Sequence, residues 1–325
     1  MRRLALLVGF LVLALALSIA FGETALSPAQ YAQGLADPAS PAGTILFGIR
    51  APRAAAAALT GAALGLAGAV MQGLLRNPLA EPGVLGVSAW SGCAAALAIA
   101  AGLGAMPGVT ELAALGGALA AGGVIALLAA RFREPETLIL FGVALAALGG
   151  ALTALVFNLS PSPITYAEML AWLQGSVANR DWPDLGAALV PMVPGAALCA
   201  YAAAGLRMLT LGEETASLSG LPMARLRVAA VAGAALLTGA SVAMAGVIGF
   251  VGLAAPHIVR GSVSDDPART LVPSAVAGAI LLVLADLAAR VIPSEEELRL
   301  GVVTALFGAP LFALIAWRAA RSWRA

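Results

Sequence analysis

Lysine is absent from this sequence, so all 18 basic residues are arginine. A chain without lysine has neither the lysine of a nucleotide-binding P-loop nor one that could form a Schiff base. His257 is the one histidine, and the two cysteines, Cys93 and Cys199, lie far apart in apolar segments. These residues are too few and too dispersed for a zinc or iron–sulfur site, so we expect buried, free thiols and no metal. G-x-S-x-G and H-E-x-x-H are also missing, and we expect no catalytic residue and no cofactor on this chain.

Charge is scarce as well. Only 11% of the 325 residues are charged and 61% are hydrophobic, which gives a mean hydropathy of +0.96. A water-soluble domain of this size could not cover its surface with such a composition, so the chain is expected to be a membrane protein. Aromatic residues make up 5%, and the abundance of alanine and glycine favours closely packed helices over a β-barrel. We predict an all-α membrane protein with a single transmembrane domain, residues 1–325.

A membrane crossing needs about 20 apolar residues, with shorter spans possible. By this measure the sequence predicts ten spans, at residues 4–21, 54–74, 86–103, 111–130, 137–157, 184–204, 228–246, 248–261, 271–290 and 300–317. The eighth is unusually short. The first could be a signal peptide, because Arg2 and Arg3 precede it and Ala20 to Gly22 resembles a cleavage site. Its apolar run is long for a signal peptide, so we favour a retained helix.

Arginine placement predicts the orientation, since short cytoplasmic loops retain basic charge. With a cytoplasmic N-terminus, the inner loops and ends hold Arg2, Arg3, Arg76, Arg131, Arg133, Arg207, Arg225, Arg227, Arg260, Arg269, Arg318, Arg321 and Arg324. The outer side holds Arg50, Arg53, Arg180, Arg290 and Arg299. Both termini are therefore predicted to be cytoplasmic.

Glycine patterns indicate close helix packing. Gly61 and Gly65 form a small-xxx-small spacing, and paired glycines recur at 116–117, 122–123 and 149–150. The stretch GAALGLAGAVMQG, Gly61 to Gly73, also echoes GAALLTGASVAMAG, Gly233 to Gly246. These two stretches lie in spans of opposite direction, so the echo suggests an inverted repeat of the kind found in transporters.

The inner loop 205–227 contains signals for a separate short helix. Thr210 and Glu213 have the spacing of a capping box, Glu213 and Glu214 suit a first turn, and Gly220 suits a helix stop. We predict a helix of two to three turns. One interpretation is an ordinary capped connector, and the other is an element held by a second protein.

Three of the five arginines on the predicted outer side, where basic residues are disfavoured, lie next to the ends of spans. Pro52 is expected near the first position of the second span, which places Arg50 and Arg53 beside its N-terminus, and Arg290 ends the ninth span. They could extend toward the membrane surface, or they could form a basic patch that docks an acidic partner. Asp286 is the expected ion-pair partner of Arg290 at i,i+4 spacing.

For the other polar residues, the sequence permits more than one role. Ser294 and Glu297 have capping-box spacing before the last span. His257 could be a functional membrane residue, although a packing role is more common. The outer segment 158–184 could border a cavity mouth or supply an interfacial aromatic belt. The remaining polar positions in or near spans are Gln72, Ser88, Thr153, Asn158, Thr238, Ser241 and Thr304, which could line a pathway or bond across helices.

Five motifs together resemble the FecCD-type permeases, the membrane subunits of ATP-binding-cassette (ABC) importers for ferric siderophores, haem and cobalamin. The motifs are NPLAEPGVLGVS (77–88), WLQGSVANRDW (172–182), LGEETASLSGLP (211–222), GVIGFVGLAAPHIVR (246–260) and ELRLGVVTALFGAP (297–310). The resemblance implies a permease of the bacterial cytoplasmic membrane that works as a homodimer with two separate ATPase subunits, which bind ATP and magnesium. It also implies a periplasmic or lipid-anchored substrate-binding protein and no nucleic-acid partner.

The resemblance further assigns candidate residues. It implies ATPase coupling by Glu213, Glu214, Ala216 and Gly220, docking of the binding protein by Arg50, Arg53 and Arg290, and a pathway near Asn158, Thr165, Gln174, Ser176 and His257. Arg299 departs from the family, which usually has proline there. The expected function is alternating-access import of an iron chelate, a ferric siderophore or haem. Cobalamin import is the first alternative, and an ion-coupled secondary transporter is a further one, although intramembrane carboxylates that could serve it are scarce.

Overall fold

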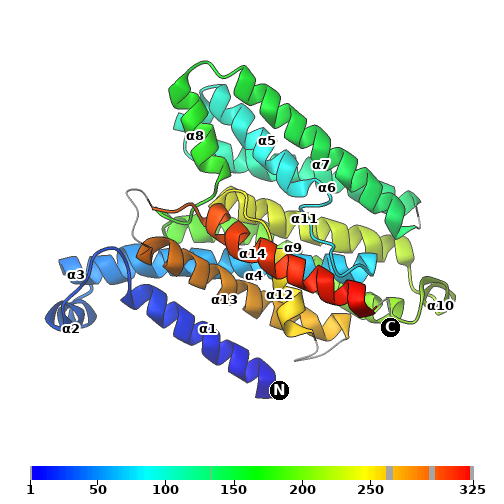
Figure 1. The fold of residues 1–325 in the computed structure, drawn as a ribbon, viewed down its shortest axis with the longest axis horizontal. Helices are drawn as coiled ribbons and strands as arrows, with labels where there is room; N and C mark the ends of the chain where they lie inside the picture. Colours follow the sequence, from blue (N-terminus) through cyan, green and yellow to red (C-terminus); the bar gives the residue numbers. More distant parts are fainter. Residues whose placement is uncertain (1, 133, 261–265, 293–296, 323–325) are drawn as a thin grey trace.

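The computed structural model describes residues 2–132, 134–260, 266–292 and 297–322, and within these ranges the regular structure is entirely helical. Figure 1 shows an elongated bundle whose long helices run broadly along one direction. The elements are α1 (Arg2–Ala20), α2 (Pro28–Ala36), α3 (Pro41–Gly43), η1 (Thr44–Arg50), α4 (Ala51–Leu75), α5 (Val87–Ala100), η2 (Leu103–Ala105), α6 (Val109–Arg131), α7 (Pro135–Asn158), α8 (Pro163–Leu173), α9 (Trp182–Leu209), α10 (Glu213–Leu218), α11 (Met223–Ala245), α12 (Val251–Val259), α13 (Pro267–Val291) and α14 (Leu300–Ser322).

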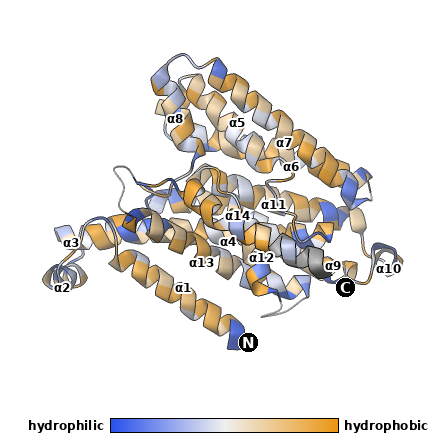
Figure 2. Ribbon diagram, in the orientation of Figure 1, coloured by the Kyte–Doolittle hydropathy of each residue, from blue (hydrophilic) through white to orange (hydrophobic). Residues whose placement is uncertain are grey.

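The all-α prediction is confirmed, and each predicted span coincides with one helix: α1, α4, α5, α6, α7, α9, α11, α12, α13 and α14. Within the described residues, seven helices are long and apolar enough to cross a membrane. The shorter apolar ones include α5 and the Leu300–Leu314 part of α14, while α12 has nine residues, as the short eighth span suggested. Figure 2 shows hydrophobic residues along the helices and hydrophilic residues gathered toward their ends.

Two antiparallel helices, α4 and α11, form the centre of the bundle (Figure 1). In their most apolar windows 72% and 78% of residues are buried, whereas α1 and α7 bury only 11%. Glycine permits the close packing: a Cβ on Gly61 of α4 would lie 2.2 Å from the carbonyl oxygen of Gly278 on α13. The two glycine-rich stretches that echo one another lie in these two central helices, and the inverted repeat stays a prediction.

The paired glycines divide between packing and open surface. A Cβ on Gly117 would meet Trp90 O at 2.3 Å and one on Gly122 would meet Ala235 Cβ at 2.3 Å, whereas Gly116 and Gly123 have nothing within 4 Å. One glycine of each pair therefore permits the contact. Cys93 and Cys199 are both buried and free, as expected.

The described ends of the chain and α10 lie at one end of the bundle, and α2 and α3 lie at the other (Figure 1). We refer to the α10 end as the inner end and to the α2–α3 end as the outer end. This arrangement agrees with an even number of crossings. That the inner end is cytoplasmic stays a prediction.

Pro52 lies in the first turn of α4 as predicted, but the helical run does not begin there. One helical run extends from Pro41 to Leu75 and begins where Ser40 Oγ accepts a hydrogen bond from Gly43 N at 3.1 Å. Its η1 segment is a π-helix, so the N–H of Ala51 donates to Leu46 O, five residues back. Pro52, the next residue, has no N–H to donate to Phe47 O. That carbonyl instead accepts a hydrogen bond from Trp182 Nε1 at 3.3 Å. Tertiary contact thus stabilises helix on both sides of Pro52.

Candidate functional site

At the outer end, a buried charge network joins α4, α13 and the segment before α14. Arg53 Nη2 lies 2.8 Å from Asp286 Oδ1, and Arg53 also pairs with Glu297. Arg290 Nη2 lies 3.0 Å from Asp286 Oδ2, one helical turn away, which confirms the predicted i,i+4 pair. The side chain of Asp286 is 2% exposed, so its carboxylate is compensated by two guanidinium groups rather than by water.

Two arginines, Arg50 and Arg290, cap the C-terminal end of α1, which has no basic residue in its own last turn. Arg50 Nη1 donates to Ala20 O at 2.7 Å, and Arg290 Nη1 donates to Phe21 O at 3.1 Å. The last carbonyls of a helix lack intrahelical partners and carry partial negative charge, so cations are favourable there. The network therefore holds α1 against α4 and α13.

The outward basic patch, one of the two interpretations of Arg50, Arg53 and Arg290, is not exposed in this structure, and the docking of a binding protein stays a prediction. Arg50 is 5% exposed and Arg290 is 8% exposed, and the side chain of Arg53 is 11% exposed. The carboxylates and helix carbonyls packed around them account for the burial. Glu297 pairs with Arg53, while Ser294, its predicted capping partner, lies outside the described residues.

At the inner end, α10 is a separate helix of six residues, shorter than predicted. Its N-cap is Gly212, and the predicted capping box does not form, because the Thr210 hydroxyl donates to Arg207 O at 2.7 Å and so closes α9. The predicted stop at Gly220 is confirmed: its φ is +82°. The N–H of Leu221 donates to Ala216 O at 3.3 Å, as in a Schellman motif.

One arginine fixes α10 to the bundle. Arg227 of α11, which is 6% exposed, pairs with Glu213 and donates to Phe132 O at 3.2 Å. Ala216 is 1% exposed and packs into the core, whereas Leu218 is 84% exposed. Helix α10 therefore has one face that packs against the bundle and an opposite face that is exposed.

A cavity of about 520 Å³ lies between α10 and the N-terminal end of α7. Glu134, Glu136, Glu213 and Glu214 contribute to its wall. Glu136 and the α10 glutamates occupy first turns of helices, where negative charge is favourable. The wall of this cavity thus carries four carboxylates and the guanidinium of Arg227, which pairs with one of them.

Two of the pathway candidates, Gln174 and Ser176, lie together at an outer-end junction. Gln174 O accepts a hydrogen bond from Gly301 N at 2.9 Å, and Ser176 N donates to Ala245 O at 2.9 Å. The segment after α8 is thus bonded to the end of α11 and the start of α14. Beside the junction, an open groove of about 640 Å³ is lined by residues of α8, the α11–α12 linker and α14.

The other pathway candidates lie elsewhere. The exposed Asn158 donates to Ala154 O in its own helix at 2.9 Å. Thr165 bonds to Ser162 at the start of α8, with 3.0 Å between the hydroxyl oxygens. His257 Nε2 lies 3.0 Å from Pro78 O and so joins α12 to the loop after α4. The five residues do not form one site.

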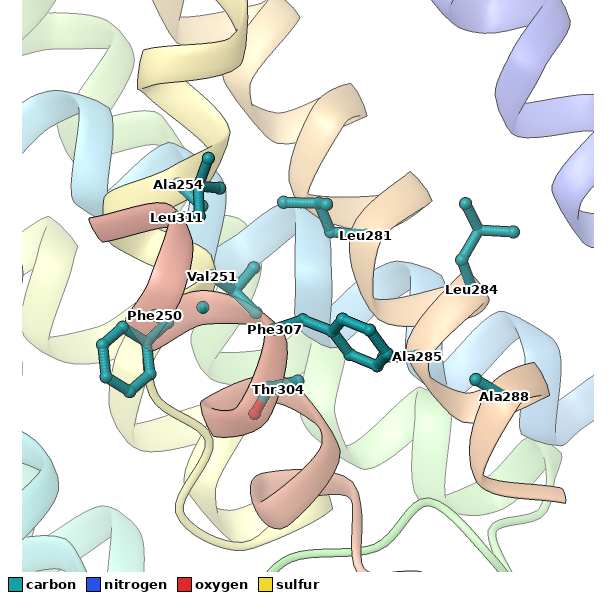
Figure 3. A pocket seen from close by; sticks show the side chains of 11 residues that line it. Phe250, Val251, Ala254, Leu281, Leu284, Ala285, Ala288, Thr304, Phe307 and Leu311 are labelled. Carbon is teal, nitrogen blue, oxygen red and sulfur yellow. The ribbon is translucent and has the colours of Figure 1, made fainter. Parts of the chain in front are cut away.

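A further cavity, of about 360 Å³, lies between α12, α13 and α14. Its lining is apolar apart from Thr304, and Figure 3 shows Phe307 projecting from α14 toward α13. Phe250 has φ +67°, a left-handed conformation that is rare for an aromatic residue. A Cβ on Gly308 would lie 2.3 Å from Phe250 Cβ, so glycine is needed there. Sequence reasoning missed this cavity, since no local signal marks Phe250 as left-handed.

None of these sites offers metal ligation: the part of the chain that the structure describes contains no group of three or more His, Cys, Asp or Glu side chains placed to hold a metal ion. The structure is that of a helical membrane bundle, with the separate helix α10 at the inner end and the groove beside Gln174 near the outer end. The sequence profile of the FecCD transport family matches residues 10–318.

The chain belongs to the FecCD transport family.

Its curated relatives are of nearly equal length. The vitamin B12 import system permease protein BtuC of Escherichia coli O157:H7 (strain EC4115 / EHEC) is 39% identical over 315 residues, which cover 96% of this chain and 93% of the relative. BtuC of Shigella flexneri is 38% identical over 316 residues, with the same coverage. BtuC of Salmonella schwarzengrund is 39% identical over 314 residues, covering 95% of this chain and 93% of the relative.

The fold also matches a solved structure described as an inward-facing conformation of a metal-chelate type ABC transporter. The two chains are 30% identical, the TM-score is 0.87, and the match covers 98% of this chain and 99% of the other. The chain is therefore an ABC importer permease of the FecCD and BtuC type. This is a transport subunit and a multi-pass membrane protein.

Proposed function

We propose that this permease imports a bulky metal chelate across a bacterial cytoplasmic membrane, with cobalamin as the first candidate. The near full-length similarity to permeases named for vitamin B12 import carries the proposal. It changes the order expected from the motifs, which placed ferric siderophore or haem ahead of cobalamin. An iron chelate is the second candidate, supported by the fold match to a metal-chelate type transporter.

The energy for transport would come from partner subunits. This chain has no lysine and hence no P-loop lysine, so ATP and magnesium would bind to two separate ATPases. The proposed assembly is a homodimer with both termini and α10 on the cytoplasmic side. There α10 would contact the ATPase through its exposed face, which includes Leu218, and the pair formed by Glu213 and Arg227 would transmit its movement to α11.

A substrate-binding protein would deliver the chelate at the outer end. The docking role of Arg50, Arg53 and Arg290 is retained as a proposal in an indirect form. Hydrogen bonds and ion pairs from these arginines to α1 and α13 would hold the outer end in one conformation. Exposed groups around them would then contact the substrate-binding protein.

Reconstitution tests this function. The permease would be placed in proteoliposomes with its ATPase and binding protein, and uptake of cyanocobalamin, a ferric siderophore and haem would be compared. We expect ATP-dependent, vanadate-sensitive uptake, fastest for cyanocobalamin. Uptake by the permease alone, without ATP, would instead support an ion-coupled transporter. Faster uptake of an iron chelate would favour the second candidate.

A further inference from the structure

A long apolar groove lies between α1, α4 and α13, on the side of the bundle that α1 borders (Figure 1). Its volume is about 570 Å³. Leu11, Leu15 and Ile19 of α1 form one wall, because side chains at this spacing share a helix face. Much of the floor consists of small side chains of α4, namely Ala51, Ala55, Ala58 and Ala62. The space that larger side chains would fill is therefore open.

Contacts at both of its ends hold α1 beside the groove. At the C-terminal end, Arg290 Nη1 donates to Ser18 O at 3.2 Å. Near the N-terminal end, Leu7 packs against the buried Ala255 of α12 and Ala277 of α13. Between these contacts, α4 presents mostly alanine toward the groove, and those side chains are too short to fill it. The groove is thus bounded by helices whose positions are set by other contacts.

The lining of the groove disfavours polar ligands. Among the described residues that line it, Trp182 has the one polar side-chain atom. That atom, Nε1, already donates to Phe47 O at 3.3 Å. A buried water molecule needs several polar partners and a buried ion needs a countercharge, and this lining supplies neither. An apolar occupant avoids both costs and gains dispersion contacts with the walls.

The position and length of the groove match one leaflet of a bilayer. Its lining residues on α4 extend from Ala51 to Leu66. At about 1.5 Å per residue this stretch is about 22 Å long, whereas half of a hydrocarbon core is about 15 Å thick. Trp182 lies at the outer end and is 54% exposed, and tryptophan is enriched where hydrocarbon meets lipid head groups. A lipid chain that begins at the level of Trp182 can therefore lie along the groove.

We propose that the groove binds an acyl chain of a phospholipid from the leaflet around the outer end, and that apolar contacts hold this chain without recognition of its head group. The second part follows from the arginines at that end, since Arg50 and Arg290 are buried and already bonded within the protein. The bound chain fills the space between α1 and α4. This inference goes beyond the proposed function, because it depends on the membrane around the bundle and not on the transported chelate.

Photolabelling tests the proposal with the full-length permease in vesicles of phosphatidylethanolamine and phosphatidylglycerol. The probe is either phospholipid with a diazirine on one acyl chain, used well below saturation, and mass spectrometry identifies the labelled peptides. We expect labels on the groove residues of α1 and α4. Ala58→Leu places a larger side chain in the groove, and Ala16→Leu makes the same change at an exposed position of α1 as the matched control.

Groove labelling should fall about tenfold in Ala58→Leu, the equivalent of roughly two buried methylene groups, and should be unchanged in Ala16→Leu. Probes with the two head groups should label the groove equally. Thermal unfolding in detergent reports whether each variant is folded, and Ala62→Leu takes the place of Ala58→Leu if that variant is not.

Three results would overturn the proposal. The first is equal groove labelling in Ala58→Leu and Ala16→Leu. The second is labelling by the phosphatidylglycerol probe alone, which would indicate recognition of an anionic head group. The third is an unlabelled groove in wild type together with a changed oligomeric state in Ala58→Leu, which would assign the groove to a second copy of the chain.

Discussion

The guanidinium group of Arg290 donates a hydrogen bond to the hydroxyl group of Ser18, with 2.6 Å between Nη2 and Oγ. The two residues are 272 positions apart in the chain, and both are buried. The same guanidinium pairs with Asp286, which also pairs with Arg53. Contacts of the first, second and ninth spans, α1, α4 and α13, are thus linked through the carboxylate of Asp286.

Asp286→Asn should destabilise the protein strongly. It leaves Arg53 and Arg290 without their shared countercharge in a buried site, and removing one partner of a buried ion pair costs roughly 3 to 5 kcal/mol. Thermal unfolding in detergent measures the effect. Arg269→Gln is the control, because its side chain is 72% exposed and its pair with Asp266 is a surface contact. Equal unfolding temperatures for both variants would contradict a structural role for the network.

Glu213→Gln should uncouple transport from ATP hydrolysis. Loss of the charge weakens the pair with Arg227 and frees α10 from α11. We expect chelate uptake to fall several-fold relative to the rate of ATP hydrolysis measured on the same complex. Arg269→Gln is the control, since it removes a charge from an exposed ion pair on α13. Equal uptake by the two variants would count against coupling through Arg227.

Cysteine crosslinking should distinguish the two faces of α10. Single cysteines at Thr215, Ser217 and Leu218 are exposed and should crosslink to the ATPase, whereas Ala216→Cys should not, because Ala216 is buried. Cys93 and Cys199 are buried, so background reaction should be low. A crosslink from Ala216→Cys alone would reverse the assigned orientation.

Glu81, in the loop between α4 and α5, should make stability depend on pH. Burial raises the pKa of this carboxyl to about 7, above its ordinary value of 4.5. The folded state therefore holds its proton more tightly than the unfolded state, and the resulting stability is full below pH 4.5 and is lost as the pH rises through 7. Glu81→Gln should raise the unfolding temperature at pH 8 more than at pH 5. An equal shift at both pH values would exclude this titration.

Ala285→Leu should stabilise the protein by about 1 kcal/mol, since it places apolar atoms in the cavity between α13 and α14. Ala313→Leu, on an exposed part of α14, adds the same atoms outside the cavity and should change stability little. Unfolding in detergent compares the two. A lower stability for Ala285→Leu than for Ala313→Leu would mean that the cavity cannot admit the side chain.

Much of the fold could be predicted because the signals are local. Each apolar run produced a helix, and Gly220 ended α10 as expected. The extension of this helix back to Pro41 could not be predicted, since Phe47 O within it accepts a hydrogen bond from Trp182 Nε1, 135 positions away. The capping box at Thr210 failed for a similar reason: α9 extends to Leu209 and uses the Thr210 hydroxyl itself.

Composition and apolar run length thus determined by themselves that this chain is an all-helical membrane protein, and they located its spans, while the resemblance of its motifs to FecCD-type permeases indicated the family. They also placed Asp286 beside Arg290, because i,i+4 spacing is fixed within a helix. Only the tertiary structure decided where the outer arginines point and which pathway candidates meet. Those outcomes depend on contacts between distant segments, where a buried guanidinium must find a carboxylate or a helix end, and the spacing of residues along the chain does not encode that choice.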